Sequence, residues 1–291
     1  MKRVVSLIFL FSFLAILGCA QVNKHQVAKK ISESQYELIN WMTSYYKNPS
    51  PNEFPDWLKK LSSKRLLKDE KKQFPFLGFA ATVFEANADK VPEWLRIIDS
   101  LPKRDRKTVL IALWLSNTKE SHNALSDISR KNLLQTRNYF NFQMQQLPPS
   151  LNAIDKYWGF LDIQWGRFLA SGTKEPIVNI TSVLEFASFL GSKNKYPKPK
   201  TKEEKWAIIN EALFTTALRS LRSNCKMHSK VMEICEQIYE EGSLGRLAQW
   251  SLKSILIEMK PDKYTIEVSS NKSLNLPART GAARSGRKGC L

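Results

Sequence analysis

Apolar residues recur at helical intervals along most of this chain, and this periodicity limits the fold more than any other feature of the sequence. The clearest stripes lie within Leu38–Tyr46, Phe76–Phe84, Val109–Trp114 and Trp158–Leu169. Apolar positions three, four and seven residues apart predict amphipathic helices. Alternation typical of a strand is confined to one short candidate, Tyr264–Val268. The sequence therefore predicts an all-α fold.

A weak internal repeat divides the helical region. Residues 52–59 (NEFPDWLK) match residues 89–96 (DKVPEWLR), and a more degenerate instance ends at Lys174–Ile177. Proline suits the first turn of a helix because its missing N–H would have no partner there, and a nearby acid suits the positive end of the helix dipole. We therefore expect an α-solenoid-like, degenerate array of stacked helical hairpins over residues 35–191. An irregular helical bundle is the alternative.

The C-terminal third shows a change of composition on either side of a helical segment. Residues 192–204 are basic and contain two prolines, which predicts an extended linker. Residues 205–260 are expected to form a C-terminal helical part. Its first helix starts near Thr201 with a capping-box-like sequence, and the next two cover Ser229–Tyr239 and Arg246–Met259. Residues 261–291 are expected to be a disordered basic tail.

Composition narrows the class of protein. Hydrophobic residues make up 43% of the 291 residues and charged residues 25%, which excludes wholesale disorder. The formal net charge is +18, and a chain this basic favours anionic partners such as membrane lipid, polyanionic glycan or nucleic acid. The sequence contains no nucleotide-binding loop, zinc-protease helix, Gly-x-Ser-x-Gly elbow or EF-hand loop.

The N-terminus has the pattern of a targeting signal. Lys2 and Arg3 precede the apolar run Val4–Leu17, whose helical length of roughly 21 Å falls short of the ~30 Å hydrocarbon core. A short basic region followed by a short apolar region is typical of a secretory signal peptide, which we expect at residues 1–18. These residues carry two basic and no acidic side chains, so the basic excess belongs to the remainder of the chain.

Residues 16–19, Ile-Leu-Gly-Cys, resemble a bacterial lipobox, with isoleucine where leucine is usual. The resemblance to bacterial lipoproteins implies cleavage before Cys19, acylation of Cys19 with palmitate-like chains, and a lipidated tether at residues 19–34. Several acyl chains together give stable anchoring. Because no aspartate follows the cysteine, the family's sorting rule implies the outer membrane, facing the periplasm, or the cell membrane where no outer membrane exists. Ordinary signal-peptide cleavage with an incidental cysteine is the alternative.

Cys225, His228 and Cys235 form the one cluster of soft metal ligands in the sequence. A zinc site needs a fourth ligand and better spacing, so we expect no metal and no cofactor. On one continuous helix the two sulfur atoms would lie roughly 15 Å apart, but polar residues at 223–224 and 228–229 indicate a turn. A Cys225–Cys235 disulfide, formed in an oxidising compartment, and unpaired cysteines both remain as alternatives.

A run of cationic side chains follows the first copy of the repeat. It comprises Lys59, Lys60, Lys64, Arg65, Lys68, Lys71 and Lys72. A solvated helix face is the ordinary explanation, and contact with anionic lipid headgroups or another polyanion near the anchor is the functional one. Nucleic acid is not expected as a partner outside the cytoplasm. The tryptophans on the apolar stripes are expected in the core rather than in a glycan-stacking groove: Trp57, Trp94, Trp114, Trp158 and Trp165.

These features favour a lipid-anchored envelope protein that acts as a binding or scaffold module through its helical-repeat surface. Its expected partners are the membrane, through the N-terminal lipid, and an envelope protein or an anionic lipid or glycan. Residues 165–172 also resemble segments of uncharacterised bacterial helical envelope proteins, which implies no activity. An envelope hydrolase acting on glycan or peptide is the first alternative, with carboxylates from Glu85, Asp155, Asp162 and Glu185. A purely structural lipoprotein is the second.

Overall fold

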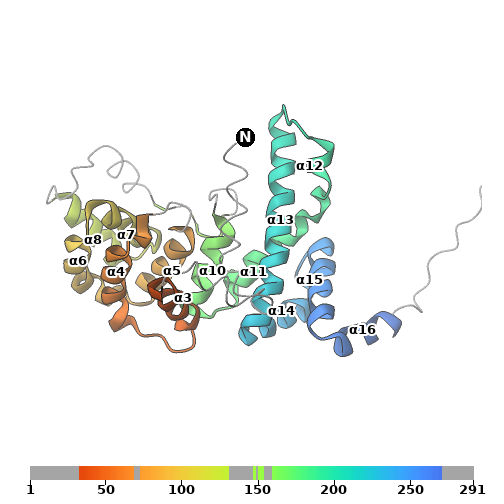
Figure 1. Ribbon diagram of the computed structural model, residues 1–291, viewed down its shortest axis with the longest axis horizontal. Coiled ribbons are helices and arrows are strands. Elements are labelled where there is room, and N and C mark those ends of the chain that lie inside the picture. The colour runs from red at the N-terminus through yellow and green to blue at the C-terminus, as the bar shows by residue number, and fades with distance from the viewer. Residues whose placement is uncertain (1–32, 69–72, 131–146, 149, 154–158, 271–291) are drawn as a thin grey trace, which may run out of the picture.

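The computed structural model describes residues 33–68, 73–130, 147–148, 150–153 and 159–270. These residues form helices and connecting turns, with no strand among them, so the all-α prediction is confirmed. The α-helices shown in Figure 1 are α3 (Glu33–Tyr45), α4 (Phe54–Ser63), α5 (Gln73–Ala86), α6 (Val91–Ser100), α7 (Lys103–Leu115), α8 (Lys119–Arg130), α10 (Phe160–Ser171), α11 (Glu175–Ser182), α12 (Ser192–Lys195), α13 (Lys202–Met227), α14 (Ser229–Glu241), α15 (Arg246–Met259) and α16 (Pro261–Ser270).

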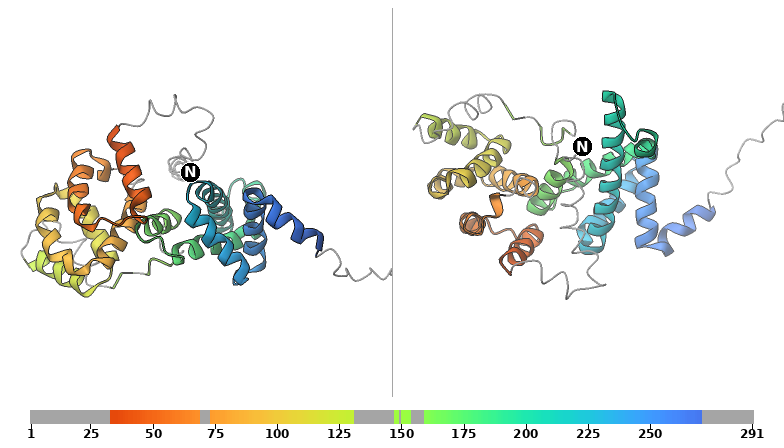
Figure 2. Two further views of the ribbon diagram at one scale, coloured as in Figure 1. Left: turned by 90° about the horizontal axis from the view of Figure 1, so that it is seen from below. Right: turned by 45° about the horizontal axis from the view of Figure 1, so that its top comes forward.

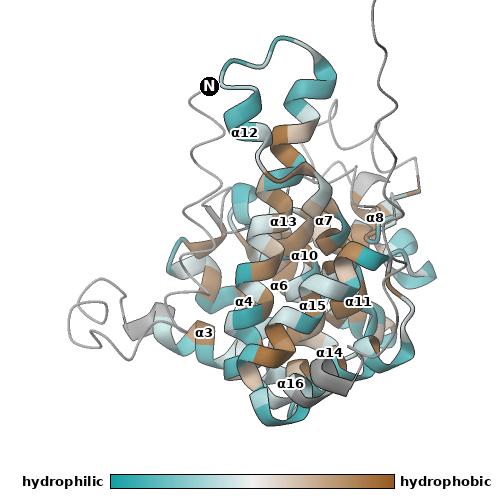
Figure 3. Cartoon of the chain, turned by 90° about the vertical axis from the view of Figure 1, so that its right-hand side faces the viewer, coloured by the Kyte–Doolittle hydropathy of each residue, from teal (hydrophilic) through white to brown (hydrophobic). Residues whose placement is uncertain are grey.

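The helices are arranged along the long axis of the molecule. Helices α3–α8 lie at one end, α10 and α11 lie in the middle, and α12–α16 lie at the other end (Figures 1 and 2). Figure 3 shows hydrophobic residues gathered in the middle of the body, whereas the hairpin around α12 is mostly hydrophilic. In this described part of the chain, no helix is both long enough and apolar enough to cross a membrane.

The repeated segment forms the same structure in both copies. A 3₁₀ turn, Pro51–Glu53 or Ala88–Lys90, leads into a ten-residue helix with proline in its first turn and an acid beside it. The two helices, α4 and α6, pack together, and the rings of Phe54 and Trp94 lie 5.3 Å apart between centroids. Helix α11, at the degenerate third copy, also starts with proline after an acid. The sequence repeat therefore marks helix starts correctly.

The most extensive contact between helices joins α5 and α10, which are distant in the sequence. Two glycines allow it. A Cβ atom on Gly78 would lie 2.1 Å from the carbonyl oxygen of Ile163, and one on Gly166 would lie 2.0 Å from the carbonyl oxygen of Pro75. Because each obstacle is backbone, no side-chain rotation could make room for a methyl group. The core of this region thus depends on close approach of two helix backbones.

Arg167, within the segment 165–172, and the nearby Gln164 have a structural use in this fold. The fully buried Gln164 donates a hydrogen bond from Nε2 to the carbonyl oxygen of Leu151 at 2.6 Å. Arg167 donates to Asn152 Oδ1 at 2.5 Å and pairs with Glu175 at 2.9 Å. This network of satisfied polar groups holds residues 150–153 and α11 against α10.

The capping box predicted at the start of α13 is confirmed. Thr201 Oγ1 accepts a hydrogen bond from the Glu204 N–H, and the Glu204 carboxylate accepts one from the Thr201 N–H, both at 3.2 Å. The linker predicted at 192–204, however, does not separate two helical parts. The 3₁₀ helix η5 (Val183–Phe189), which precedes it, packs on both α13 and α15. The prediction of a boundary was wrong because the prolines lie in a hairpin that returns to the same core.

Residues 261–270 form α16, so the predictions of a strand at 264–268 and of disorder at the start of the tail were wrong. Tyr264 is 1% exposed and lies edge-on to Tyr239 of α14. Its hydroxyl donates to Glu236 at 3.0 Å, and Glu236 also pairs with Lys260 and Lys263. Packing against α14 therefore buries Tyr264 and stabilises a helix that the local sequence does not predict. Residues 271–291 lie outside the described part of the chain.

Candidate anion-binding pocket

The cationic run does not lie on one helix face, because α4 ends at Ser63 and the chain then turns. Arg65 lies in that turn with φ +56°, a backbone conformation uncommon for residues other than glycine. Lys60 pairs with Glu37 of α3, and its ammonium lies 4.6 Å from the Trp57 ring centre. Lys64 is exposed at the end of α4. The side chains of the remaining three, Lys68, Lys71 and Lys72, lie outside the described residues.

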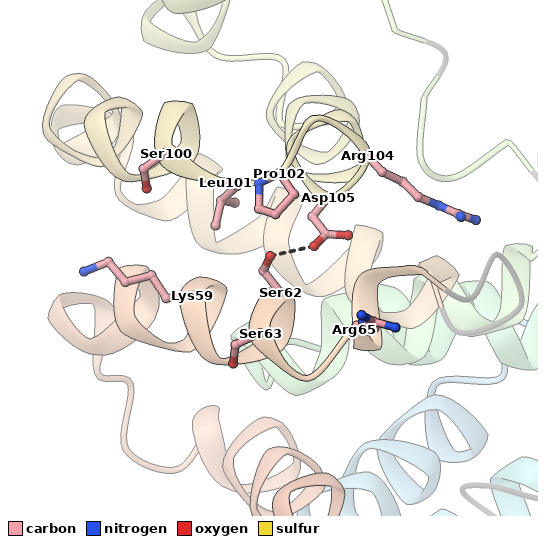
Figure 4. A pocket seen from close by; sticks show the side chains of 9 residues that line it. All are labelled: Lys59, Ser62, Ser63, Arg65, Ser100, Leu101, Pro102, Arg104 and Asp105. Atoms are coloured by element: carbon pink, nitrogen blue, oxygen red, sulfur yellow. Dashed lines mark hydrogen bonds between the residues drawn. The ribbon is translucent and has the colours of Figure 1, made fainter.

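Lys59 and Arg65 line an open pocket of about 540 Å³ between α4 and the start of α7. Figure 4 shows Lys59 at one side of this pocket and Arg65 and Arg104 at the other. The full lining is Lys59, Ser62, Ser63, Arg65, Ser100, Leu101, Pro102, Arg104 and Asp105. We call this the basic pocket.

A buried hydrogen bond holds the two walls of the basic pocket together. Ser62 Oγ on α4 donates to Asp105 Oδ2 on α7 at 2.5 Å, and each residue is 7% exposed. A short hydrogen bond that is shielded from water is stronger than one exposed to solvent. The bond fixes the pocket's shape and engages its one acidic side chain.

The start of α7 forms the second wall of the basic pocket. The residue before the helix is Pro102, and no side chain caps the helix there. The first N–H groups of a helix have no carbonyl partner within it, so a helix start favours negative charge. Arg106 steadies the preceding loop by donating to the carbonyl oxygens of Leu101, at 3.1 Å, and Asp99.

The charge balance of the basic pocket favours an anion. Three cationic side chains line it against one carboxylate. Lys59 also pairs with Asp56 at 3.2 Å, but the two side chains are 54% and 80% exposed, and such surface pairs contribute little free energy. The lining holds no histidine or cysteine, and Ser62 donates to an acid rather than to a base. The arrangement is therefore suited to binding phosphate, sulfate or carboxylate groups rather than to activating a nucleophile.

Sequence reasoning identified one wall of the basic pocket and missed the other. Lys59 and Arg65 belong to the predicted run, whereas Arg104 and Asp105 come from a segment about forty residues later. The signal that could have found them is the cluster Lys-Arg-Asp-Arg-Lys at 103–107, which directly follows a proline. Its proximity to α4 depends on how α7 packs.

Among the described residues, the carboxylates proposed for a hydrolase have different surroundings. Glu185 accepts a hydrogen bond from the Ala248 N–H at 3.0 Å and so caps the start of α15. Glu85 is exposed near the end of α5. Asp162 is half-buried on α10, and burial raises its pKa to about 7. Asp155 lies outside the described residues, and among those described no three His, Cys, Asp or Glu side chains form a metal-binding group.

The turn predicted between Cys225 and Cys235 is confirmed. Helix α13 ends at Met227, His228 is extended, and α14 starts at Ser229. The two sulfur atoms lie 3.7 Å apart as buried thiols. His228 points elsewhere: its Nδ1 lies 3.2 Å from the Tyr46 hydroxyl. Burial, with a smaller contribution from Lys47, lowers the pKa of His228 to about 4.

The tryptophans divide between core and surface. Trp94 and Trp165 are buried as predicted, and Trp57 and Trp114 are half-buried. Trp57 stacks on Trp41 with ring centres 4.7 Å apart.

Trp158 and the lipidation candidate Cys19 lie outside the described residues. Two tryptophans that the sequence did not single out are exposed, Trp206 on α13 and Trp250 on α15.

Comparison of this chain with protein-family models, with curated proteins and with solved structures gives no match.

Proposed function

We propose that this protein is a lipid-anchored binding module of the cell envelope, and that its basic pocket docks an anionic group of the partner. The observation that carries the proposal is that Lys59, Arg65 and Arg104 all line one pocket, which has a single carboxylate. The partner is an envelope component that presents a phosphate, sulfate or carboxylate group, such as an anionic lipid or glycan. The acyl chains on Cys19 hold the protein at a membrane, and the pocket selects what it contacts there.

Three observations support binding over hydrolysis. The side chains of the pocket match the donors that recognise anions, with guanidinium and ammonium groups beside an uncapped helix start. The pocket's carboxylate is held by Ser62, and Glu185, a candidate acid for hydrolysis, caps α15 instead. The excess of basic residues over the whole chain also draws the protein towards anionic surfaces.

Reversing charge in the basic pocket is expected to weaken binding to anionic vesicles by tenfold or more. The variant is Lys59→Glu/Arg65→Glu, tested in a Cys19→Ser background so that acyl chains do not contribute. Each basic side chain near an anionic surface contributes about 1 kcal/mol, so loss and reversal of two is a large effect. Co-sedimentation with phosphatidylglycerol vesicles and retention on an immobilised sulfated polysaccharide are the measurements.

The matched control is Lys198→Glu/Lys205→Glu, which changes the net charge equally at two exposed sites away from the pocket. This control variant is expected to weaken binding less than threefold. Its small loss comes from weaker long-range electrostatic attraction, which added salt screens. Equal losses in the two double variants would show that total charge decides binding and would refute a docking role for the pocket.

Replacing Cys19 by serine is expected to move the protein from the membrane fraction to the soluble fraction. Buried acyl chains contribute about 0.8 kcal/mol per CH₂, far more than the basic surface can supply alone. Fractionation and metabolic labelling with an alkyne palmitate analogue measure the effect, with Cys290→Ser as the control that keeps both anchor and label. A Cys19→Ser protein that stays in the membrane fraction would contradict acylation as the anchor.

A further inference from the structure

We propose that Cys225 and Cys235 form an intramolecular disulfide that joins α13 to α14. The two residues lie on opposite sides of the turn at His228, on helices that pack against each other. Their sulfur atoms are 3.7 Å apart. This inference is independent of the basic pocket, but it rests on the proposed envelope location, because the bond forms in an oxidising compartment.

The distance between the two thiols is close to what a disulfide requires. Bonded sulfur atoms lie about 2.0 Å apart, so the two atoms need to approach by roughly 1.7 Å. Each sulfur swings about its own Cα–Cβ bond, and a partial rotation of the two side chains covers such a distance without separating the helices. A pair on one continuous helix would have no such option.

The burial of the two thiols determines the stage of folding at which the disulfide forms. Cys225 is 7% exposed and Cys235 is fully buried, so a disulfide-bearing oxidant has little access to either sulfur in the packed hairpin. The hydrogen-bonding contact between the two thiols, together with burial, also raises the pKa of Cys235 well above its usual range. The exchange therefore takes place while the hairpin is still open, as the chain folds in an oxidising compartment.

The chemistry is two successive thiol–disulfide exchanges with a small or protein disulfide RSSR. The Cys225 thiolate attacks one sulfur of RSSR, forms a mixed disulfide and releases RS⁻. The Cys235 thiolate then attacks the Cys225 sulfur of that mixed disulfide, which forms the intramolecular bond and releases the second RS⁻. The two cysteines lose two electrons, RSSR gains them, and the protons of the two thiols end on two molecules of RSH.

The bond is testable by peptide mapping of the full chain. The protein is refolded in a buffer of oxidised and reduced glutathione, alkylated with iodoacetamide and digested with trypsin without reduction. Cleavage after Arg222, Lys226, Lys230 and Arg246 places the two cysteines in peptides 223–226 and 231–246. The expected product is these two peptides joined, two hydrogens lighter than their sum. Recovery of both peptides alkylated and separate, or joined to the Cys19 or Cys290 peptide instead, would overturn the proposal.

A stability measurement complements the mapping. Closing a loop of this length constrains the unfolded chain, so a reductant is expected to raise the unfolding equilibrium constant on the order of 100-fold. The Cys19→Ser/Cys290→Ser variant retains only the proposed pair and is expected to respond to reductant like the wild type. The Cys225→Ala/Cys235→Ala variant is expected not to respond. If the denaturation midpoint of the wild-type protein does not change when a reductant is added, the proposed disulfide is contradicted.

Discussion

A Gly166→Ala variant is expected to lose about 3 kcal/mol of unfolding free energy, because the added methyl group meets the backbone of α5 at two successive turns. Its Cβ would lie 2.0 Å from the Pro75 carbonyl oxygen and 2.7 Å from the Phe79 nitrogen. Helices α5 and α10 must then separate by about 1 Å, which weakens dispersion contacts along their interface. Alanine's better helix propensity returns only about 1 kcal/mol. Urea denaturation followed by circular dichroism measures the loss.

A double-variant cycle distinguishes a clash from a general effect of glycine replacement. Gly78→Ala meets the Ile163 carbonyl oxygen across the same interface and is expected to cost a similar amount. Once one methyl group has parted the helices, the second costs less, so the double variant should lose less than the sum. The control is Gly242→Ala, where no atom lies within 4 Å and only the backbone at φ +62° opposes the change. A Gly166→Ala loss no larger than that of Gly242→Ala would contradict close packing of α5 on α10.

Acidification is expected to destabilise the protein through His228, by about 3 kcal/mol between pH 7 and pH 4. Burial, aided by Lys47, lowers the pKa of His228 from its usual 6.5 to about 4. Between these two values the unfolded chain binds a proton that the folded protein rejects, so stability falls as the pH falls and levels off below about 4. The Nε2 atom has no hydrogen-bond partner among the described residues, and the ring lies beside Tyr46 and Phe168.

The measurement compares wild type with His228→Gln across this pH range. Asp162 opposes the effect, since its raised pKa of about 7 makes the folded protein bind a proton more readily than the unfolded chain. The histidine contribution is therefore the difference between the two denaturation profiles, not the slope of one. Lys47→Gln is expected to reduce the loss by removing the smaller cause of the shift. Parallel profiles for wild type and His228→Gln would show that His228 is not held neutral by burial.

The sequence predicted local structure well because local structure follows from nearby residues. Proline beside an acid marked the starts of α4, α6 and α11, and the Thr201–Glu204 capping box marked the start of α13. The turn between Cys225 and Cys235 followed from polar residues that interrupt a helical stripe. In each case the deciding hydrogen bonds or backbone limits act within a few residues.

The sequence was less informative about α16. Its five-residue alternation at 264–268 suggested a strand, and its composition suggested a tail. The helix forms because Tyr264 docks on Tyr239 and because Glu236 of α14 binds Lys260 and Lys263. These partners come from another helix, and no local pattern indicates them. Tertiary contact thus decided a secondary structure that propensity left open.

By itself, the order of residues determined an all-helical fold, several of its helix starts, its excess of positive charge and the turn that faces two cysteines towards each other. Only the tertiary structure decided that α5 lies on α10, that the hairpin at 192–204 returns to one core, and that Asp105 meets Ser62 to shape the basic pocket. The physical reason is the distance along the chain over which each interaction acts. Caps, turns and apolar periods act over one or two helical turns, whereas the pocket depends on which distant backbones can approach closely, and that is settled by packing of the whole core.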